Sequence, residues 1–343
     1  MNPILVIKFG TASITKPNGT PDEAVILEIA RQVAQLRDRY RVVLVSSGAV
    51  GAGRGFLKSY RGTLRERKAA AAIGNPILLG LYAKFFSAYG IPIAQSLCER
   101  QHFANRSQFL QLKETYEELW ANGVIPIANE NDVVSNLELK FSDNDELATL
   151  IAAGFGADTL LFSTSVGGLL DTEGHIIPQV ARIDEAVLGL ADQSKSSLGL
   201  GGMTSKLSFA KRATRLGIRV VIFGIHTPEG ILKALSGETG TVFVPDENAL
   251  SARQKWLGSG SLATGQVVAD AGAVRALKAR RSLLAVGIGA IRGEFDRGEV
   301  IEILDETGES VAVAKARISS EALAQQLRTP NVAVAHADDI VLL

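Results

Sequence analysis

Short apolar segments rich in β-branched residues alternate with segments of helical periodicity over the first 250 residues of this 343-residue chain. Six such segments recur, at residues 4–9, 42–45, 91–95, 124–128, 159–162 and 220–223. Strands that are apolar on both faces have to be covered on both faces, which is typical of a parallel sheet built from strand–helix–strand units. The pattern therefore predicts an α/β domain in which helices sandwich an open, mainly parallel sheet.

The pattern changes near residue 245. Residues 245–248 form a turn-rich polar stretch, and beyond residue 265 short strand-like segments dominate, at 283–286, 299–304 and 310–316. Turn-forming residues at 293–298 and 305–308 separate them. We expect one domain at residues 1–250, a linker at 251–263 and a small, mostly β domain at 264–343.

Local signals also place three helices. Thr20, Pro21 and Glu23 resemble a helix start with Thr20 as the N-cap. A second helix is expected over residues 65–89, with a break or kink at Asn75–Pro76. A third is expected over residues 203–216, ending at Gly217.

The composition excludes several classes of protein. Cys98 is the single cysteine and lies in an apolar run, so it cannot form an internal disulfide or a multi-cysteine zinc site. The four histidines are scattered, and we expect no metal site built from them. Basic and acidic residues balance to a net charge of zero. No apolar stretch reaches about 18 residues, and the N-terminus lacks the features of a signal peptide, so we expect a cytoplasmic protein without a membrane partner.

Four polar clusters follow predicted strands, where open α/β sheets form their sites. They lie at residues 8–13, 46–53, 129–132 with 143–145, and 199–206. A glycine-rich turn that opens a helix and carries Lys206 can bind phosphate through backbone N–H groups, the helix dipole and the lysine charge. The glycine spacing matches neither the dinucleotide fingerprint nor the Walker A loop.

Each cluster also has a structural alternative, as an ordinary turn, a solvated loop or a hinge. Together they supply two lysines, two glycine-rich turns and an acidic and amide block, with no nucleophilic triad. Phosphoryl transfer requires positive charge around the moving group and accurate placement of donor and acceptor. The combination therefore favours phosphoryl transfer.

The segments KFGTAS, SSGAVGAG, IPIANEND, FSDNDELA and GLGGMTSK, in this order, resemble those of the glutamate 5-kinases in the amino acid kinase family. The β-rich tail resembles the PUA domain that follows many of these kinase domains. The resemblance implies the amino acid kinase fold and ATP-dependent phosphorylation of the L-glutamate side-chain carboxylate to L-glutamyl 5-phosphate, the first step of proline biosynthesis. It also implies Mg²⁺, feedback inhibition by proline, a homo-oligomer (dimer or tetramer) and hand-off of the product to glutamyl phosphate reductase.

The same resemblance assigns roles by motif position. Lys8 and Lys206 would stabilise the transferring phosphoryl group, and Asp145 would orient both lysines. Glutamate would be bound by Ser47, Asn129, Asp132, Asp143 and Asn144. The nucleotide would be bound by Lys8, Thr164, Ser165, Gly201, Gly202, Met203, Thr204 and Lys206. Two positions depart from the family pattern: Ser165 replaces an aspartate at the nucleotide rim, and Leu200 replaces a common threonine.

Two alternatives stay open. One is a related amino acid kinase acting on another acid, such as acetylglutamate or aspartate, or on UMP. The other is RNA binding through the PUA-like tail. Residues 264–343 hold nine Lys and Arg against eleven Asp and Glu. This net charge of −2 argues against binding a phosphate backbone and favours a regulatory or assembly role for the tail.

Overall fold

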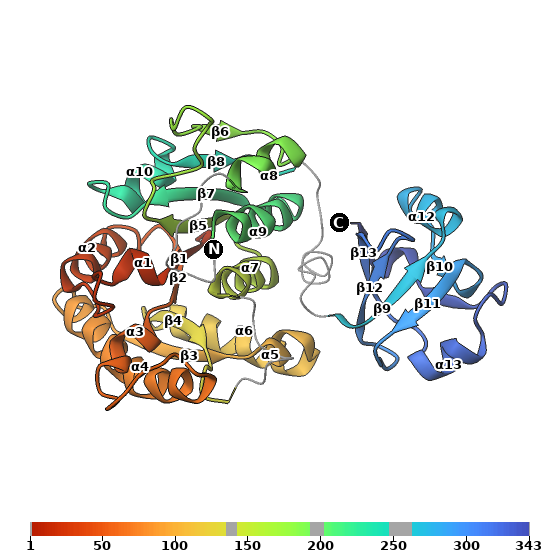
Figure 1. Ribbon diagram of the computed structural model, residues 1–343, viewed down its shortest axis with the longest axis horizontal. Coiled ribbons are helices and arrows are strands. Elements are labelled where there is room, and N and C mark those ends of the chain that lie inside the picture. The colour runs from red at the N-terminus through yellow and green to blue at the C-terminus, as the bar shows by residue number, and fades with distance from the viewer. Residues whose placement is uncertain (1, 135–142, 193–201, 247–262, 343) are drawn as a thin grey trace. The chain divides into compact units, whose positions relative to one another are not determined.

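The computed structural model describes residues 2–134, 143–192, 202–246 and 263–342 (Figure 1). The chain divides into two compact units, residues 1–99 with 111–247 and residues 100–110 with 248–343. The main break falls after residue 247, but residues 100–110 group with the second unit, which the expected domains did not include, so the boundaries at 250 and 264 stay a prediction. Most of the expected linker at 251–263 lies outside the described residues, although Ala263 already begins a strand.

An eight-stranded sheet forms the centre of the first unit, in the order β3-β4-β2-β1-β5-β7-β8-β6. All neighbouring pairs are parallel except β7 and β8. The strands are β1 Ile4–Phe9, β2 Arg41–Ser46, β3 Ile93–Cys98, β4 Ile125–Glu130, β5 Thr159–Thr164, β6 Gln179–Val180, β7 Arg219–Gly224 and β8 Thr241–Phe243. The six expected strands are therefore confirmed, and β6 and β8 are additions at one edge.

Helices cover both faces of this sheet, as Figure 1 shows, with α2, α4 and α10 on one side and α7 and α9 on the other. The helices before residue 247 are α1 Thr11–Ile14, α2 Glu23–Ala34, α3 Ala49–Arg54, α4 Leu64–Ser87, α5 Arg100–Ala104, α6 Arg106–Ala121, α7 Asn144–Phe155, α8 Glu185–Asp192, α9 Met203–Arg215 and α10 Gly230–Ser236. The expected fold class, an open and mainly parallel sheet between helices, is confirmed.

Alternation along β1 decides which side chains reach each face. Leu5, Ile7 and Phe9 belong to the core cluster that includes residues of α2, α4 and α10. Because successive side chains of a strand point to opposite faces, Val6 and Lys8 point toward the face that α7 and α9 cover. The alternation of side chains along β1 therefore directs Lys8 toward the first turns of α7 and α9.

The expected helix start at Thr20 was wrong. The N-cap of α2 is Asp22, whose side chain accepts from the backbone N–H groups of Ala24 and Val25. Thr20 instead donates its hydroxyl to Asn18, and Pro21 forms an isolated β-bridge with Thr15. This bridge holds Pro21 in an extended turn, so the helix starts two residues later than the local pattern indicated.

The helix α4 is continuous through Asn75 and Pro76, so of the expected break or kink the break is wrong and the kink stays a prediction. A Cβ atom on Gly74 would collide with the carbonyl oxygen of Ala49, and one on Gly53 with that of Ala70. The two glycines let α3 and α4 approach backbone to backbone, and this packing holds α4 together despite the missing N–H of Pro76.

By length and composition alone, α4 could also cross a membrane, contrary to the expectation that no such segment exists. In the structure Leu78, Tyr82 and Phe86 belong to the core of the first unit, and Gly74 and Asn75 are also buried. The position of α4 in the core explains part of its apolar character, because 39% of the apolar window is buried.

The second unit contains a five-stranded sheet, ordered β11-β9-β12-β13-β15, and a two-stranded sheet of β10 and β14. Its elements from residue 263 are β9 Ala263–Ala269, α12 Ala271–Lys278, β10 Leu283–Leu284, β11 Ile288–Arg292, β12 Val300–Leu304, β13 Ser310–Lys315, α13 Ser320–Gln325, β14 Ala333–Ala335 and β15 Ile340–Leu342, with 3₁₀ turns at Ala285–Gly287 and Ala337–Asp339. This unit has a core cluster of its own. It is mostly β, as expected.

Candidate active site

The polar clusters gather at one edge of the large sheet because their strands are parallel. Lys8 is the penultimate residue of β1, Ser47 follows β2, Asn129 lies near the end of β4, and Thr164 ends β5. The pairing of β1 with β2 and β5, and of β2 with β4, brings these four carboxyl ends to the same edge. Open parallel sheets bind their ligands at this edge.

At the centre of this edge, one carboxylate holds two lysines. Asp145 Oδ1 lies 2.5 Å from Lys8 Nζ, and Asp145 Oδ2 lies 3.1 Å from Lys206 Nζ. Asp145 is fully buried, while Lys8 is 4% exposed and Lys206 is 6% exposed. Asp145 comes from the first turn of α7 and Lys206 from that of α9, on the face toward which Lys8 points.

The electrostatics of this triad follow from its burial. Burial works to raise the pKa of Asp145, but the charges and hydrogen bonds of Lys8 and Lys206 outweigh it, so the pKa is lowered. Burial lowers the pKa of Lys206, as does the like charge of Lys8, while Asp145 opposes this shift. Within the triad two cations face one anion, and the carboxyl of Asp143 lies close enough to interact with both lysines.

A chain of amide side chains extends from this centre. Asn144 Nδ2 donates to Ser47 Oγ and to Asn129 Oδ1, both at 2.9 Å. Asn129 Nδ2 in turn donates to Asn75 Oδ1 at 2.9 Å. The chain joins β2, β4, α4 and α7, and it leaves the buried Oδ1 of Asn144 without a hydrogen-bond partner among the described residues.

Asp143 anchors the start of α7 and touches α9. Its Oδ1 accepts from the backbone N–H groups of Asp145 and Glu146, and its Oδ2 accepts from Ser205 Oγ at 2.5 Å. Burial and the charge of Asp145 raise the pKa of Asp143. This residue therefore holds the first turns of α7 and α9 together, which fixes the distance between Asp145 and Lys206.

The N-terminus of α9 faces the same centre. Gly202 is its N-cap and offers no side chain, Met203 is nearly buried and Thr204 is exposed. An N-terminus of this kind presents backbone N–H groups and the positive end of the helix dipole to an anion. Gly201 lies outside the described residues.

The remaining predicted residues lie at the rim. Thr164 ends β5 half-buried, and its hydroxyl accepts from the N–H of Val166. Ser165 is exposed just beyond it. Asp132 lies half-buried in the turn after β4. The structure thus places all three at the edge that holds the lysines, without a direct contact to Asp145.

The sequence patterns missed two residues of this network. Asn75 is buried within an apolar helix and was interpreted as a helix breaker, although a buried amide in such a helix needs a partner. Ser205 lies inside the glycine-rich motif, but its bond to Asp143 spans 62 residues. The described part of the chain contains no group of three or more His, Cys, Asp or Glu side chains arranged to hold a metal ion.

Comparisons with known proteins agree with this geometry. The sequence profile described as "Amino acid kinase family" matches residues 3–224, and the PUA domain profile matches residues 265–337. A carbamate kinase from Giardia lamblia bound to AMP-PNP superposes with a TM-score of 0.52 at 18% identity, covering 71% of this chain and 99% of that one. At this identity the likeness concerns the fold.

The fold, the buried lysine–aspartate centre and the profile match define a class: the chain belongs to the amino acid kinase family. Curated relatives narrow the assignment within this family. Glutamate 5-kinase from Shewanella oneidensis is 39% identical over 98% of this chain and 92% of its own length, and that from Moorella thermoacetica is 39% identical over 94% and 88%. Within the family, the chain is one of the glutamate 5-kinases.

Proposed function

We propose that this protein transfers the γ-phosphoryl group of ATP to the side-chain carboxylate of L-glutamate, giving L-glutamyl 5-phosphate and ADP in the first step of proline biosynthesis. The observation that carries the proposal is the pair of buried lysines on one buried carboxylate, at the carboxyl edge of a parallel sheet. The relatedness to glutamate 5-kinases identifies the acceptor.

Lys8 and Lys206 act on the transferring group. The transition state of phosphoryl transfer spreads negative charge over the oxygens of the moving phosphoryl group, and fixed cations in a water-poor site stabilise that charge strongly. Asp145 keeps both ammonium groups at the same place, so they need no rearrangement when the substrates arrive. We assign Asp145 a positioning role.

The acceptor itself is the nucleophile. A glutamate side chain is ionised at neutral pH, so its carboxylate attacks the γ-phosphorus and no proton has to be removed. Asp145 is unsuited to be a general base because both its oxygens face lysines and its pKa is lowered. The site therefore works by placement and charge.

The amide chain and the acidic residues beside it form the glutamate subsite in this proposal. Amide and hydroxyl groups can bind the α-carboxylate, and carboxylates can bind the α-ammonium group. We assign these roles to Ser47, Asn129, Asp132, Asp143 and Asn144. Asn75 belongs to the subsite as a positioning residue, because it fixes the amide of Asn129.

The nucleotide subsite lies at the N-terminus of α9. Residues Gly201, Gly202, Met203 and Thr204 would receive the phosphates, with Thr164 and Ser165 at the rim. Both oxygens of Asp145 face lysines, which fits Mg²⁺ entering with ATP on phosphate oxygens and water rather than in a protein cage. When bound, Mg²⁺ neutralises charge on the phosphates.

Regulation and assembly complete the proposal. We expect a cytoplasmic homo-oligomer that proline inhibits and that passes its labile acyl phosphate to glutamyl phosphate reductase. The PUA-like unit would serve regulation or assembly, because its acidic balance gives little attraction to RNA.

The test is ADP release with Mg-ATP, with hydroxylamine trapping any acyl phosphate. L-glutamate, N-acetylglutamate, aspartate and UMP are compared, each with and without proline. Hydroxamate formed with L-glutamate alone, and suppressed by proline, is the expected result. Hydroxamate with another acid, or ADP release with UMP alone, would refute the acceptor and leave the lysine roles intact. No turnover with any acceptor would refute the proposal.

A further inference from the structure

A cavity of about 280 Å³ lies in the first unit, and none of the residues that line it belongs to the lysine–aspartate centre. It is lined by the end of β6 and the residues after it, by the second half of α9, and by the end of β8. The strand β8 runs antiparallel to β7, and β6 runs parallel to β8. The strands β6 and β8 therefore end at the edge of the sheet where β7 begins. The cavity is therefore at the opposite edge of the sheet from the candidate active site.

Helix α9 connects the two sites. Lys206, in its first turn, contacts Asp145, whereas Lys211 and Arg215 follow five and nine residues later. At about 1.5 Å per residue these positions lie roughly 7 and 13 Å further along the helix. The cavity therefore uses side chains that the proposed chemistry does not.

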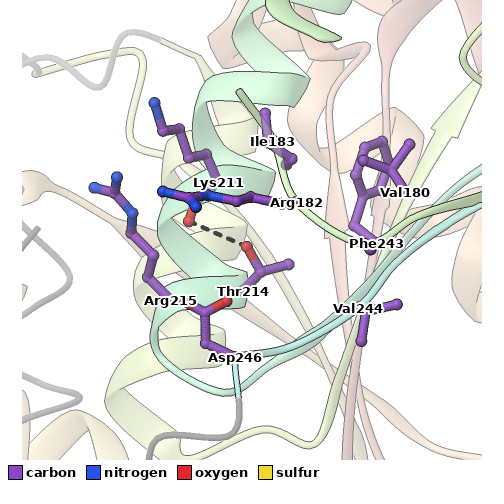
Figure 2. Close-up of a pocket in the computed structure, with 10 residues that line it drawn as sticks. Val180, Arg182, Ile183, Lys211, Thr214, Arg215, Phe243, Val244 and Asp246 are labelled. Atoms are coloured by element: carbon purple, nitrogen blue, oxygen red, sulfur yellow. Dashed lines mark hydrogen bonds between the residues drawn. The ribbon is translucent and has the colours of Figure 1, made fainter. Parts of the chain in front are cut away.

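The cavity has an apolar side and a basic side. Val180, Phe243 and Val244 lie on one side of it in Figure 2, while the side chains of Arg182, Lys211 and Arg215 extend on the other. Phe243 is fully buried, Val180 is 7% exposed and Val244 is half-buried, so most of the apolar wall is buried. This combination suits a ligand with an apolar body and an anionic end.

The charges around the cavity do not balance. Three basic side chains face one carboxylate, that of Asp246, which leaves about two positive charges. Among the described residues, none of the three basic side chains forms an ion pair. Burial lowers the pKa of Arg215 and the neighbouring charge of Arg182 lowers it further, while Asp246 opposes the shift. The exposed guanidinium group of Arg182 thus repels the half-buried guanidinium group of Arg215.

We propose that this cavity is a second ligand site, which binds a small phosphomonoester through Arg182, Lys211 and Arg215. A phosphomonoester carries about −1.5 to −2 charges at neutral pH, which matches the local excess of positive charge. Its oxygens can accept bidentate hydrogen bonds from guanidinium groups. Its organic body would lie against Val180, Phe243 and Val244.

The test is calorimetric titration of the full-length protein with phenyl phosphate. AMP-PNP and L-glutamate are present at saturating concentration so that the active site is filled. We expect one binding site, with tighter binding of phenyl phosphate than of inorganic phosphate, which lacks the apolar body, or of benzoate, which carries one charge. Equal binding of benzoate would overturn the assignment to a dianion.

The decisive variant is the double substitution Arg182→Gln and Lys211→Gln. Arg182 is exposed and Lys211 is half-buried, so both changes spare the core. Losing two charge-assisted contacts should weaken phenyl phosphate binding at least about tenfold. Arg212→Gln is the matched control, because Arg212 adjoins Lys211 on α9 but packs over Phe209 outside the cavity. The affinity of the Arg212→Gln variant for phenyl phosphate should stay near that of the unmodified protein.

Two results would refute the second site. One is the absence of binding by phenyl phosphate, and the other is binding that the double variant leaves unchanged. If the double variant does not fold, Arg182→Gln alone gives the same comparison. Because binding is measured directly, a failure of the glutamate kinase assay does not affect this test. A Lys206→Met variant that retains phenyl phosphate binding would also show that the ligand is not in the active site.

Discussion

Asp145 is the residue on which the candidate active site depends. It is fully buried, and it compensates two buried ammonium groups that would otherwise repel each other. A buried charge that loses its partner costs far more free energy than the pair contributes. Asp145 therefore affects both the stability of the fold and the catalytic site, and separate substitutions can measure the two effects.

We predict that Asp145→Asn lowers the free energy of unfolding by about 3–5 kcal/mol, because two buried lysines then lose the carboxylate that contacts both of them. The double variant Asp145→Asn with Lys206→Met should recover much of this loss while remaining inactive. Urea unfolding followed by circular dichroism measures both. A double variant no more stable than the single one would contradict the shared counter-ion.

Lys206→Met tests the role of the second lysine in catalysis. Its charge stabilises the transition state more than the bound substrates, so kcat should fall by about 10²–10³ while the glutamate KM changes little. Steady-state hydroxamate kinetics measure both constants. A raised KM with unchanged kcat would instead make Lys206 a binding residue.

Asn75→Ala tests the amide chain. Removing its Oδ1 leaves the amide of Asn129 without this partner, at a cost of about 1–3 kcal/mol. We expect the glutamate KM to rise by about tenfold, because a tenfold change corresponds to about 1.4 kcal/mol, which lies within this range. We expect kcat to change less. A double-mutant cycle with Asn129→Ala should be non-additive. Additive effects would show that the contact does not position the amide.

At the scale of elements, the contact between α3 and α4 explains how an apolar helix with an internal proline stays continuous. Gly53 and Gly74 let the two helices meet backbone to backbone. This contact lies directly after β2, where Gly48 adopts a φ of 102° that disfavours other residues. The same turn carries Ser47, so the packing of α3 on α4 also places a residue of the glutamate subsite.

We predict opposite effects of the same substitution at two glycines of α4. Gly74→Ala places a Cβ against the carbonyl of Ala49 and should destabilise the protein by about 1–3 kcal/mol. Gly80→Ala is the control, because Gly80 has open space around it and alanine favours helix by up to about 1 kcal/mol. Thermal unfolding compares them. Equal shifts at both positions would show that the helix contact tolerates a side chain.

At the scale of the whole molecule, the two units differ in their expected functions. Every described residue of the candidate active site lies in the first unit, and the second has its own sheets and core. The amino acid kinase match ends at residue 224 and the PUA match begins at residue 265. The chemistry should therefore not need the second unit.

We predict that residues 1–250, which keep only residues 100–110 and the first few residues after 247 of the second unit, form glutamate hydroxamate with a kcat of the same order as the full chain. Oligomeric state and proline sensitivity are the properties that should change, if the second unit serves regulation or assembly. Kinetics and light scattering on both forms measure this. Loss of turnover by a folded 1–250 fragment would place the second unit in the catalytic machinery.

The sequence predicted the main strands well because their apolar, β-branched character is local and strong. The short strands β6 and β8, of two and three residues, were not predicted, because segments of this length carry no periodicity and form only by pairing with distant residues. Asp22 displaced Thr20 as the helix cap for a related reason. The isolated β-bridge between Thr15 and Pro21 keeps Pro21 extended, so the helix begins only after Asp22.

By itself, the sequence determined the α/β class, the β-rich tail and the identity of most polar residues at the site, because strand periodicity and glycine-rich motifs are local properties. Only the tertiary structure decided that Asp145 holds Lys8 and Lys206 together and that Asn75 supports Asn129. It also placed three basic side chains, one from the segment after β6 and two from α9, around one cavity. These contacts join residues far apart in the chain, and burial gives them their strength.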